Sequence, residues 1–151
     1  MSPTIQYPGP ALSDREIAAF ERRLDARLPH DYRVFLREFN GGIPDACYFS
    51  ALHERLLVQS FSRLAPGRRD DLETITRSFE GRIPSSFLPI ALDPQGSMFL
   101  LSLREGTRGR VYFWDQEREP EDPTDELASF SNVYEIAPSF TDFFGALYVS
   151  Q

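Results

Sequence analysis

The chain has 151 residues, a length typical of one domain, and its 41% hydrophobic and 26% charged residues are those of a folded globule rather than a disordered tail. Its net charge of −7, from 16 basic and 23 acidic residues, disfavours direct binding to nucleic acid, whose phosphates attract cations. All 16 basic residues are arginine, which excludes Schiff-base lysines and the lysine of phosphate-binding loops.

The single cysteine, Cys47, excludes an intramolecular disulfide and a cysteine-rich zinc site. No stretch approaches the ~20 apolar residues that a membrane span needs. Residues 1–10 lack the basic and apolar regions of a signal peptide. We therefore expect a cytoplasmic protein that binds no membrane and uses no metal or other cofactor.

Residues 1–12, rich in proline, are predicted to form an extended N-terminal segment before a single domain at residues 13–151. Ser13 and Glu16 have the spacing of a capping box, and the apolar residues after them recur at helical intervals up to Leu28, so a first helix should end at Pro29. A second helix is predicted over residues 30–40. It should stop at Asn40-Gly41-Gly42, because glycine allows the left-handed conformation of a helix end; a binding loop is the less favoured interpretation.

The middle of the chain predicts a strand at residues 56–61 and a third helix that begins near Asp70. A meander of strands follows, at residues 88–92, 98–103 and 111–114, and a fourth strand is predicted at residues 133–136. A last helix should begin after Ser139. Helices at both ends of a run of hairpin-connected strands predict an α+β fold, in which N-terminal helices and a C-terminal helix flank a central, mainly antiparallel sheet.

The helical and strand periodicities also predict the core. We expect a single core to bury most of nine apolar residues: Phe20, Leu24, Phe35, Phe39, Leu100, Val111, Phe113, Phe140 and Phe144.

The most distinctive local feature is the acidic segment, residues 115–126, where seven acids and one arginine give −6 of the net charge of −7. The acids are Asp115, Glu117, Glu119, Glu121, Asp122, Asp125 and Glu126. Two prolines disfavour regular structure here, so we expect an exposed loop. It is either a solubilising surface or a docking surface for a basic protein, whose association a concentrated negative patch accelerates. A calcium site is disfavoured because the spacing of a calcium-binding loop is missing.

Two aromatic residues of the preceding strand, Tyr112 and Trp114, adjoin the acidic segment. Strand aromatics are more often part of a core, but an exposed one could anchor a protein partner. The predicted partner-binding site therefore comprises Tyr112, Trp114 and the seven acids.

Catalytic residues are scarce in this sequence. Cys47 and His53 could form a nucleophile and base pair, but no third residue is recognisable that would orient the histidine. The other histidine, His30, belongs to no catalytic motif. We expect a protein that is not an enzyme.

An ordered series of short motifs spans residues 13–148. The motifs are Leu28-Pro29-His30-Asp31-Tyr32, Phe39-Asn40-Gly41-Gly42, Phe87-Leu88-Pro89-Ile90-Ala91, Val111-Tyr112-Phe113-Trp114-Asp115 and Ile136-Ala137-Pro138-Ser139-Phe140. Together they resemble the SUKH superfamily, specifically the Smi/Knr-like proteins. The resemblance implies a single α+β domain with a central antiparallel sheet. It also implies either a bacterial immunity protein that binds and neutralises a toxin, often a nuclease, or a regulatory or scaffold protein linked to cell-wall synthesis.

Overall fold

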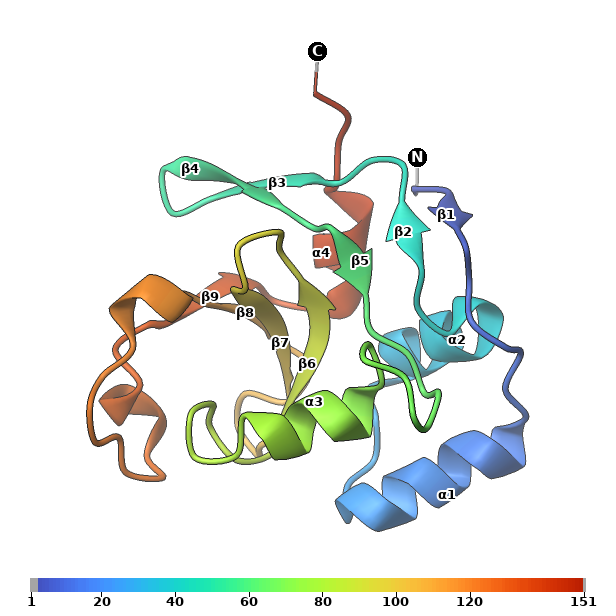
Figure 1. Cartoon of the computed structure of the whole chain (residues 1–151), viewed down its shortest axis with the longest axis horizontal. Helices are drawn as coiled ribbons and strands as arrows, with labels where there is room; N and C mark the ends of the chain where they lie inside the picture. Colours follow the sequence, from blue (N-terminus) through green and yellow to red (C-terminus); the bar gives the residue numbers. More distant parts are fainter. Residues whose placement is uncertain (1–2, 151) are drawn as a thin grey trace.

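The computed structural model describes residues 3–150, and within that range the chain forms four α-helices and nine β-strands (Figure 1). The helices are α1 (Asp14–Leu24), α2 (His30–Phe39), α3 (Leu72–Ser78) and α4 (Phe140–Gly145). The strands are β1 (Ile5–Gln6), β2 (Ile43–Pro44), β3 (Tyr48–Ala51), β4 (Glu54–Leu57), β5 (Ser60–Phe61), β6 (Phe87–Leu92), β7 (Met98–Ser102), β8 (Val111–Trp114) and β9 (Val133–Ala137).

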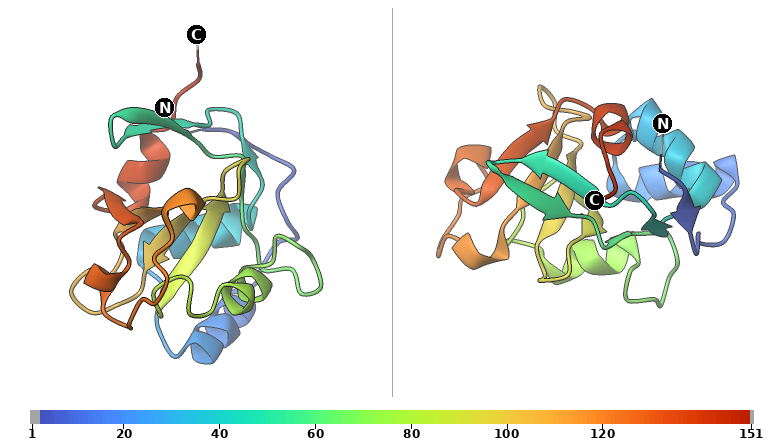
Figure 2. Two further views of the ribbon diagram at one scale, coloured as in Figure 1. Left: turned by 60° about the vertical axis from the view of Figure 1, so that its left-hand side comes forward. Right: turned by 90° about the horizontal axis from the view of Figure 1, so that it is seen from above.

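The central sheet is antiparallel and has the order β5-β6-β7-β8-β9 (Figure 1). Strands β3 and β4 form a separate hairpin across one end of this sheet, beside the C-terminal residues (Figure 2). Strand β1 of the N-terminal segment pairs with β2. The predicted α+β fold is therefore confirmed. Among residues 3–150, no helix combines the length and the apolar character that crossing a membrane requires.

Both faces of the central sheet are covered. Phe99 and Phe113 belong to a large cluster that also takes in apolar residues of α1, α2, α4 and the β3–β4 hairpin. Leu100 and Trp114 point the other way, into a second cluster that includes Ile75 of α3. Because successive side chains of a strand alternate between faces, the continuous apolar runs of β7 and β8 supply both clusters.

Aromatic rings fill much of the large cluster. The ring of Phe143 in α4 lies 5.1 Å from that of Phe49 in β3 and 5.4 Å from that of Phe99 in β7. Phe35 of α2 lies 4.9 Å from Phe61 and contacts α4 through rings 5.0 and 5.2 Å away. These tilted and edge-on contacts join two helices, the hairpin and the sheet in one core.

The nine predicted core residues divide between the two clusters. Six of the nine are buried; Leu24, Phe39 and Phe144 are half-buried and pack against the large cluster. Leu100 is buried in the second cluster instead, so the core that takes in the other eight residues does not include it. Strand alternation is the reason, because Leu100 is one residue from Phe99 and faces the opposite side.

Two predicted boundaries also differ from the structure. The capping box of Ser13 and Glu16 is present, but α1 ends earlier than Pro29, because Asp25 adopts a left-handed conformation with φ 54°. The single strand predicted for residues 56–61 divides into β4 and β5, which pair with different strands.

The Asn40-Gly41-Gly42 sequence stops α2, as its favoured interpretation predicted. Asn40 has a left-handed φ of 49°, and its buried amide donates to the carbonyl oxygens of Pro10 and Leu64 while accepting from the Leu64 N–H at 2.7 Å. Gly41 has φ 85°, and a Cβ there would lie 2.9 Å from the Phe61 and Ser62 carbonyl oxygens. The loop is occupied by internal contacts, which fits a structural role.

Candidate functional site

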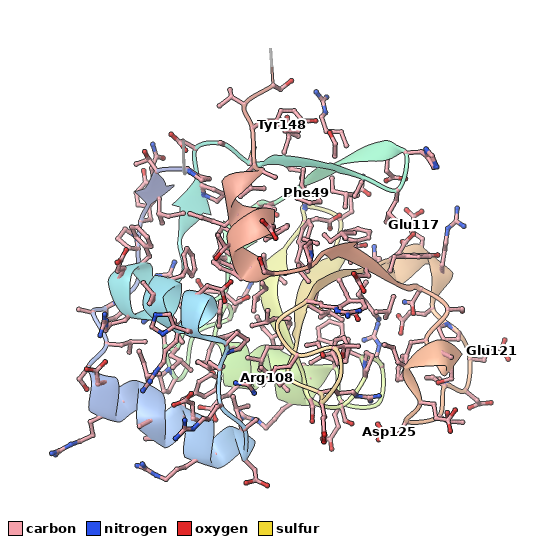
Figure 3. All side chains as sticks on the ribbon, turned by 180° about the vertical axis from the view of Figure 1, so that it is seen from behind. Phe49, Arg108, Glu117, Glu121, Asp125 and Tyr148 are labelled. Atoms are coloured by element: carbon pink, nitrogen blue, oxygen red, sulfur yellow. The ribbon has the colours of Figure 1, made fainter. Side chains whose placement is uncertain are left out.

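The acidic segment leaves the end of β8 and continues toward β9 along one side of the molecule, where Glu117, Glu121 and Asp125 mark its course (Figure 3). A short 3-10 helix, Gln116–Arg118, begins it. The Asp115 carboxylate accepts the Glu117 N–H at 3.0 Å and lies 3.5 Å from the Arg118 guanidinium. The first acid of the segment therefore serves local structure.

Arg82, outside the segment, binds its centre. The guanidinium donates two hydrogen bonds to the Glu119 carboxylate, at 2.6 and 3.1 Å, and lies over the rings of Phe79 and Trp114 at 4.7 and 5.7 Å. The hydrogen bonds with Glu119 and its negative charge raise the pKa of Arg82. A bidentate pair restrains the orientation of both side chains, so Glu119 is held against the body of the protein.

Arg104 binds the far end of the segment. Its Nη2 donates to the Asp125 carbonyl oxygen at 2.8 Å and to the Asp125 carboxylate at 3.2 Å. The hydroxyl of Ser85 donates to the same carboxylate at 2.7 Å. Arg82 and Arg104 together restrain a segment that has little regular secondary structure.

Five acids of the segment are exposed: Asp125, which Arg104 and Ser85 bind, and the four acids Glu117, Glu121, Asp122 and Glu126. Within residues 3–150, none of the four carboxylates has an ion-pair partner. Asp115, Glu119 and Asp125 are paired internally, so fewer than the seven predicted acids are free to attract a partner.

The structure corrects the prediction that Tyr112 and Trp114 contact a partner. Trp114 has no exposed surface and Tyr112 is 4% exposed. Both point into the second cluster, and the Trp114 indole N–H donates to the Arg82 carbonyl oxygen at 3.0 Å. A partner cannot reach a buried ring, so these two residues leave the site. The unbroken apolar run of β8, typical of a strand covered on both faces, was the available signal.

The sequence did not point to Arg82 or Arg104 as parts of the site. Arg82 lies 37 residues before Glu119, and Arg104 lies 21 residues before Asp125. Contacts over such separations depend on tertiary structure and leave no local spacing pattern. The prolines at positions 120 and 123 indicated an irregular segment but gave no sign of what restrains it.

The histidines and the cysteine are dispersed. Cys47 lies at the base of the β3–β4 hairpin, where its carbonyl oxygen accepts the Val58 N–H at 2.7 Å, whereas His53 lies in the turn at the tip. A four-residue strand spans about 13 Å, so the two side chains are well separated. His30 begins α2. Among residues 3–150, no three His, Cys, Asp or Glu side chains form a group that could hold a metal ion.

Comparison with known proteins gives a family. No curated protein matches the chain. The model of the SMI1 / KNR4 family (SUKH-1), however, matches residues 11–146, which takes in all four helices and every strand of the central sheet. The chain therefore belongs to the SMI1/KNR4 (SUKH-1) family.

Proposed function

We propose that this chain is a cytoplasmic immunity protein that binds a toxin and neutralises it without catalysis, with the acidic segment as part of its docking surface. The observation that carries the proposal is the arrangement of that segment. It is restrained by Arg82 and Arg104 and presents four exposed carboxylates that are not used internally. Family membership is consistent with this function and equally with a regulatory or scaffold protein, because the resemblance to SUKH proteins implies both classes.

The charge of the segment favours a basic partner. Clustered charges of one sign accelerate the encounter with an oppositely charged protein and disfavour partners of like charge. A nuclease toxin fits this surface, because a nuclease must carry cationic groups to bind nucleic-acid phosphates. Covering those groups with carboxylates would both hold the toxin and exclude its substrate.

Binding without catalysis agrees with the placement of the reactive side chains. Cys47 and His53 occupy opposite ends of one hairpin, so neither can activate the other. We expect Cys47→Ser and His53→Ala to leave neutralisation unchanged. Complete loss of neutralisation by either folded variant would support an enzyme instead.

Neutralisation can be tested with a toxin encoded directly beside this gene. The chain and the toxin domain are produced together in sensitive cells, and survival is measured. We expect protection by the parent chain. A variant with Glu117→Gln, Glu121→Gln and Asp122→Asn should associate more slowly at low salt and approach the parent rate as salt screens the charges.

A matched control makes the same chemical changes elsewhere. Asp25, Glu38 and Glu105 are also exposed and take part in no ion pair of the described residues, so Asp25→Asn, Glu38→Gln and Glu105→Gln alter the net charge equally. Equal association rates for both triple variants would place the docking surface elsewhere. An isolated gene together with a cell-wall phenotype on deletion would favour the regulatory or scaffold function.

A further inference from the structure

A groove adjoins the acidic segment on the side of α3. It has a volume of about 580 Å³ and opens between the C-terminal end of α3, residues 80–87 and residues 123–130. Its apolar lining residues are Ile83, Pro84, Phe87, Pro123 and Phe130, of which Pro123 is half-buried and the other four are buried. A concave apolar site of this size can accept a large side chain from another molecule.

The two sides of the groove are joined by Arg104. Its Nε donates to the Ser85 carbonyl oxygen at 2.9 Å, its Nη2 donates to the Asp125 carbonyl oxygen at 2.8 Å, and its guanidinium lies 5.5 Å from the centre of the Phe87 ring. Phe87 and Phe130 are only 1% and 4% exposed, so they are fixed by packing beneath the groove and add little to the surface that a partner can touch. The groove is therefore formed before any partner arrives, which lowers the entropic cost of binding.

The rim of the groove is predominantly acidic. Glu80 lines it without an ion-pair partner among the described residues, and Asp122 and Glu126 adjoin the lining residues 123–125 in sequence. Asp125 also lines the groove, but its charge is compensated by Arg104. Arg77 is the one basic side chain lining the groove among the described residues. An apolar floor with a mainly negative rim complements an apolar side chain that has basic neighbours.

Charge alone leaves the binding surface incomplete. Exposed ion pairs contribute little affinity, because water and salt screen them and ordering the side chains costs entropy. Tight interfaces depend on a few anchors buried in pockets. Tyr112 and Trp114 cannot serve as such anchors because they lie in the core.

We propose that the groove receives an apolar side chain from a basic segment of the partner, with arginine or lysine residues on both sides of that anchor. This inference rests on the proposed function and adds where affinity arises: the anchor comes from the partner, and this chain supplies the groove. The acidic segment then contributes association rate and selectivity for basic partners.

The probes are three synthetic peptides with blocked ends: Arg-Arg-Leu-Arg-Arg, the same peptide with glycine for leucine, and Glu-Glu-Leu-Glu-Glu. The readout is the NMR signal of the Ile83 methyl group during titration. We expect the basic leucine peptide to shift this signal and to bind about tenfold or more tightly than the glycine peptide, from burial of one leucine side chain. The acidic peptide should not bind.

Variants that fill the groove test the location. Thr76→Trp and Thr124→Trp introduce an indole from opposite sides, so the failure of one to fold leaves the other as a test. Ala11→Trp adds the same side chain at an exposed position on the N-terminal segment, outside the groove lining. We expect both groove variants to lose selectivity for leucine over glycine, and the control to keep it.

Several outcomes would overturn the groove proposal. These are equal binding of the leucine and glycine peptides, binding of the acidic peptide, or signal changes confined to residues 115–126. Sedimentation showing a dimer that Thr124→Trp dissociates would make a second copy of this chain the occupant and also overturn it. If the groove proposal fails but the chain still protects cells from the toxin, the proposed function stands. If protection fails but the groove still selects the leucine peptide, the proposed function fails and the groove proposal stands.

Discussion

The two faces of the central sheet are covered in different ways. On one face, α2 and α4 bring a dense set of phenylalanine rings against β6, β7 and β8. The other face is covered by the short helix α3 and by loop residues such as Leu127, which follows the acidic segment. On this second face, Arg82 and Arg104 restrain the acidic segment through their contacts with Glu119 and Asp125, where helices cover the first face.

Under the proposed function, this difference separates the face that stabilises the fold from the face that binds a partner. The face covered by α2 and α4 buries large rings away from solvent, so it contributes mainly to the free energy of unfolding. The opposite face combines a buried second cluster with exposed acids and an open groove. Proteins commonly bind partners through loops held on a rigid scaffold, and this side of the molecule has that arrangement.

The largest expected effect comes from removing one ring of the first face. Phe143→Ala should lower the free energy of unfolding by about 3–5 kcal/mol, because its ring is fully buried among Phe49, Phe61 and Phe99. Leu127→Ala on the opposite face should cost only about 1 kcal/mol, because this side chain is half-buried. Urea unfolding followed by circular dichroism measures both values. Equal costs would contradict the division between the two faces.

A second comparison uses two buried asparagines. Asn40→Ala should cost about 1–3 kcal/mol, because it leaves the Leu64 N–H and two carbonyl oxygens without their partner. Asn132→Ala, beside the acidic segment, removes only one side-chain hydrogen bond, to the Asp115 carbonyl oxygen at 2.9 Å. We expect the smaller loss from Asn132→Ala in the same unfolding experiment. The reverse order would show that the acidic segment contributes more to stability than its contacts indicate.

The elements with strong local signals could be predicted from sequence. The capping box located the start of α1, and the apolar runs located β6, β7 and β8. The hairpin of β3 and β4 was missed because its turn is Leu52-His53, with φ 57° and 61°, where asparagine and glycine are the usual signal. Positive φ at these two residues is imposed by the fold and has no local sequence signature.

The candidate site was predictable in composition but less so in geometry. Seven acids in twelve residues identified the acidic segment. Which carboxylates are free depended on Arg82 and Arg104, distant in sequence. The groove is formed by three segments that only the folded chain brings together.

Loosening the acidic segment should affect local order more than global stability. Arg82→Met removes the bidentate pair with Glu119 but keeps an apolar stem, so the free energy of unfolding should fall by about 1 kcal/mol or less. Amide hydrogen exchange of residues 115–130 should become faster. Arg110→Met, which removes an exposed pair with Glu135 on β9, is the control and should leave that exchange unchanged. Unchanged exchange in both variants would mean that Arg82 does not restrain the segment.

The smallest effect at neutral pH concerns Tyr32, on the face covered by α2 and α4. Its hydroxyl is buried without a hydrogen-bond partner among the described residues, and burial raises the pKa of the phenol. Above about pH 10 the unfolded chain releases this proton while the folded chain keeps it, so the free energy of unfolding falls as pH rises.

Tyr32→Phe removes that contribution. Near pH 7 the free energy of unfolding should change by no more than about 0.5 kcal/mol, because the lost hydroxyl has no partner. Between pH 9 and about pH 11, the variant should lose less stability than the parent chain. Some alkaline sensitivity should remain, because burial and the nearby Glu135 charge also raise the pKa of Tyr112 on the opposite face.

Tyr7→Phe changes an exposed tyrosine and should follow the parent curve. If the free energy of unfolding depends on pH in the same way for Tyr32→Phe and the parent, the Tyr32 hydroxyl reaches water. The face covered by α2 and α4 would then be less closed than its aromatic packing indicates.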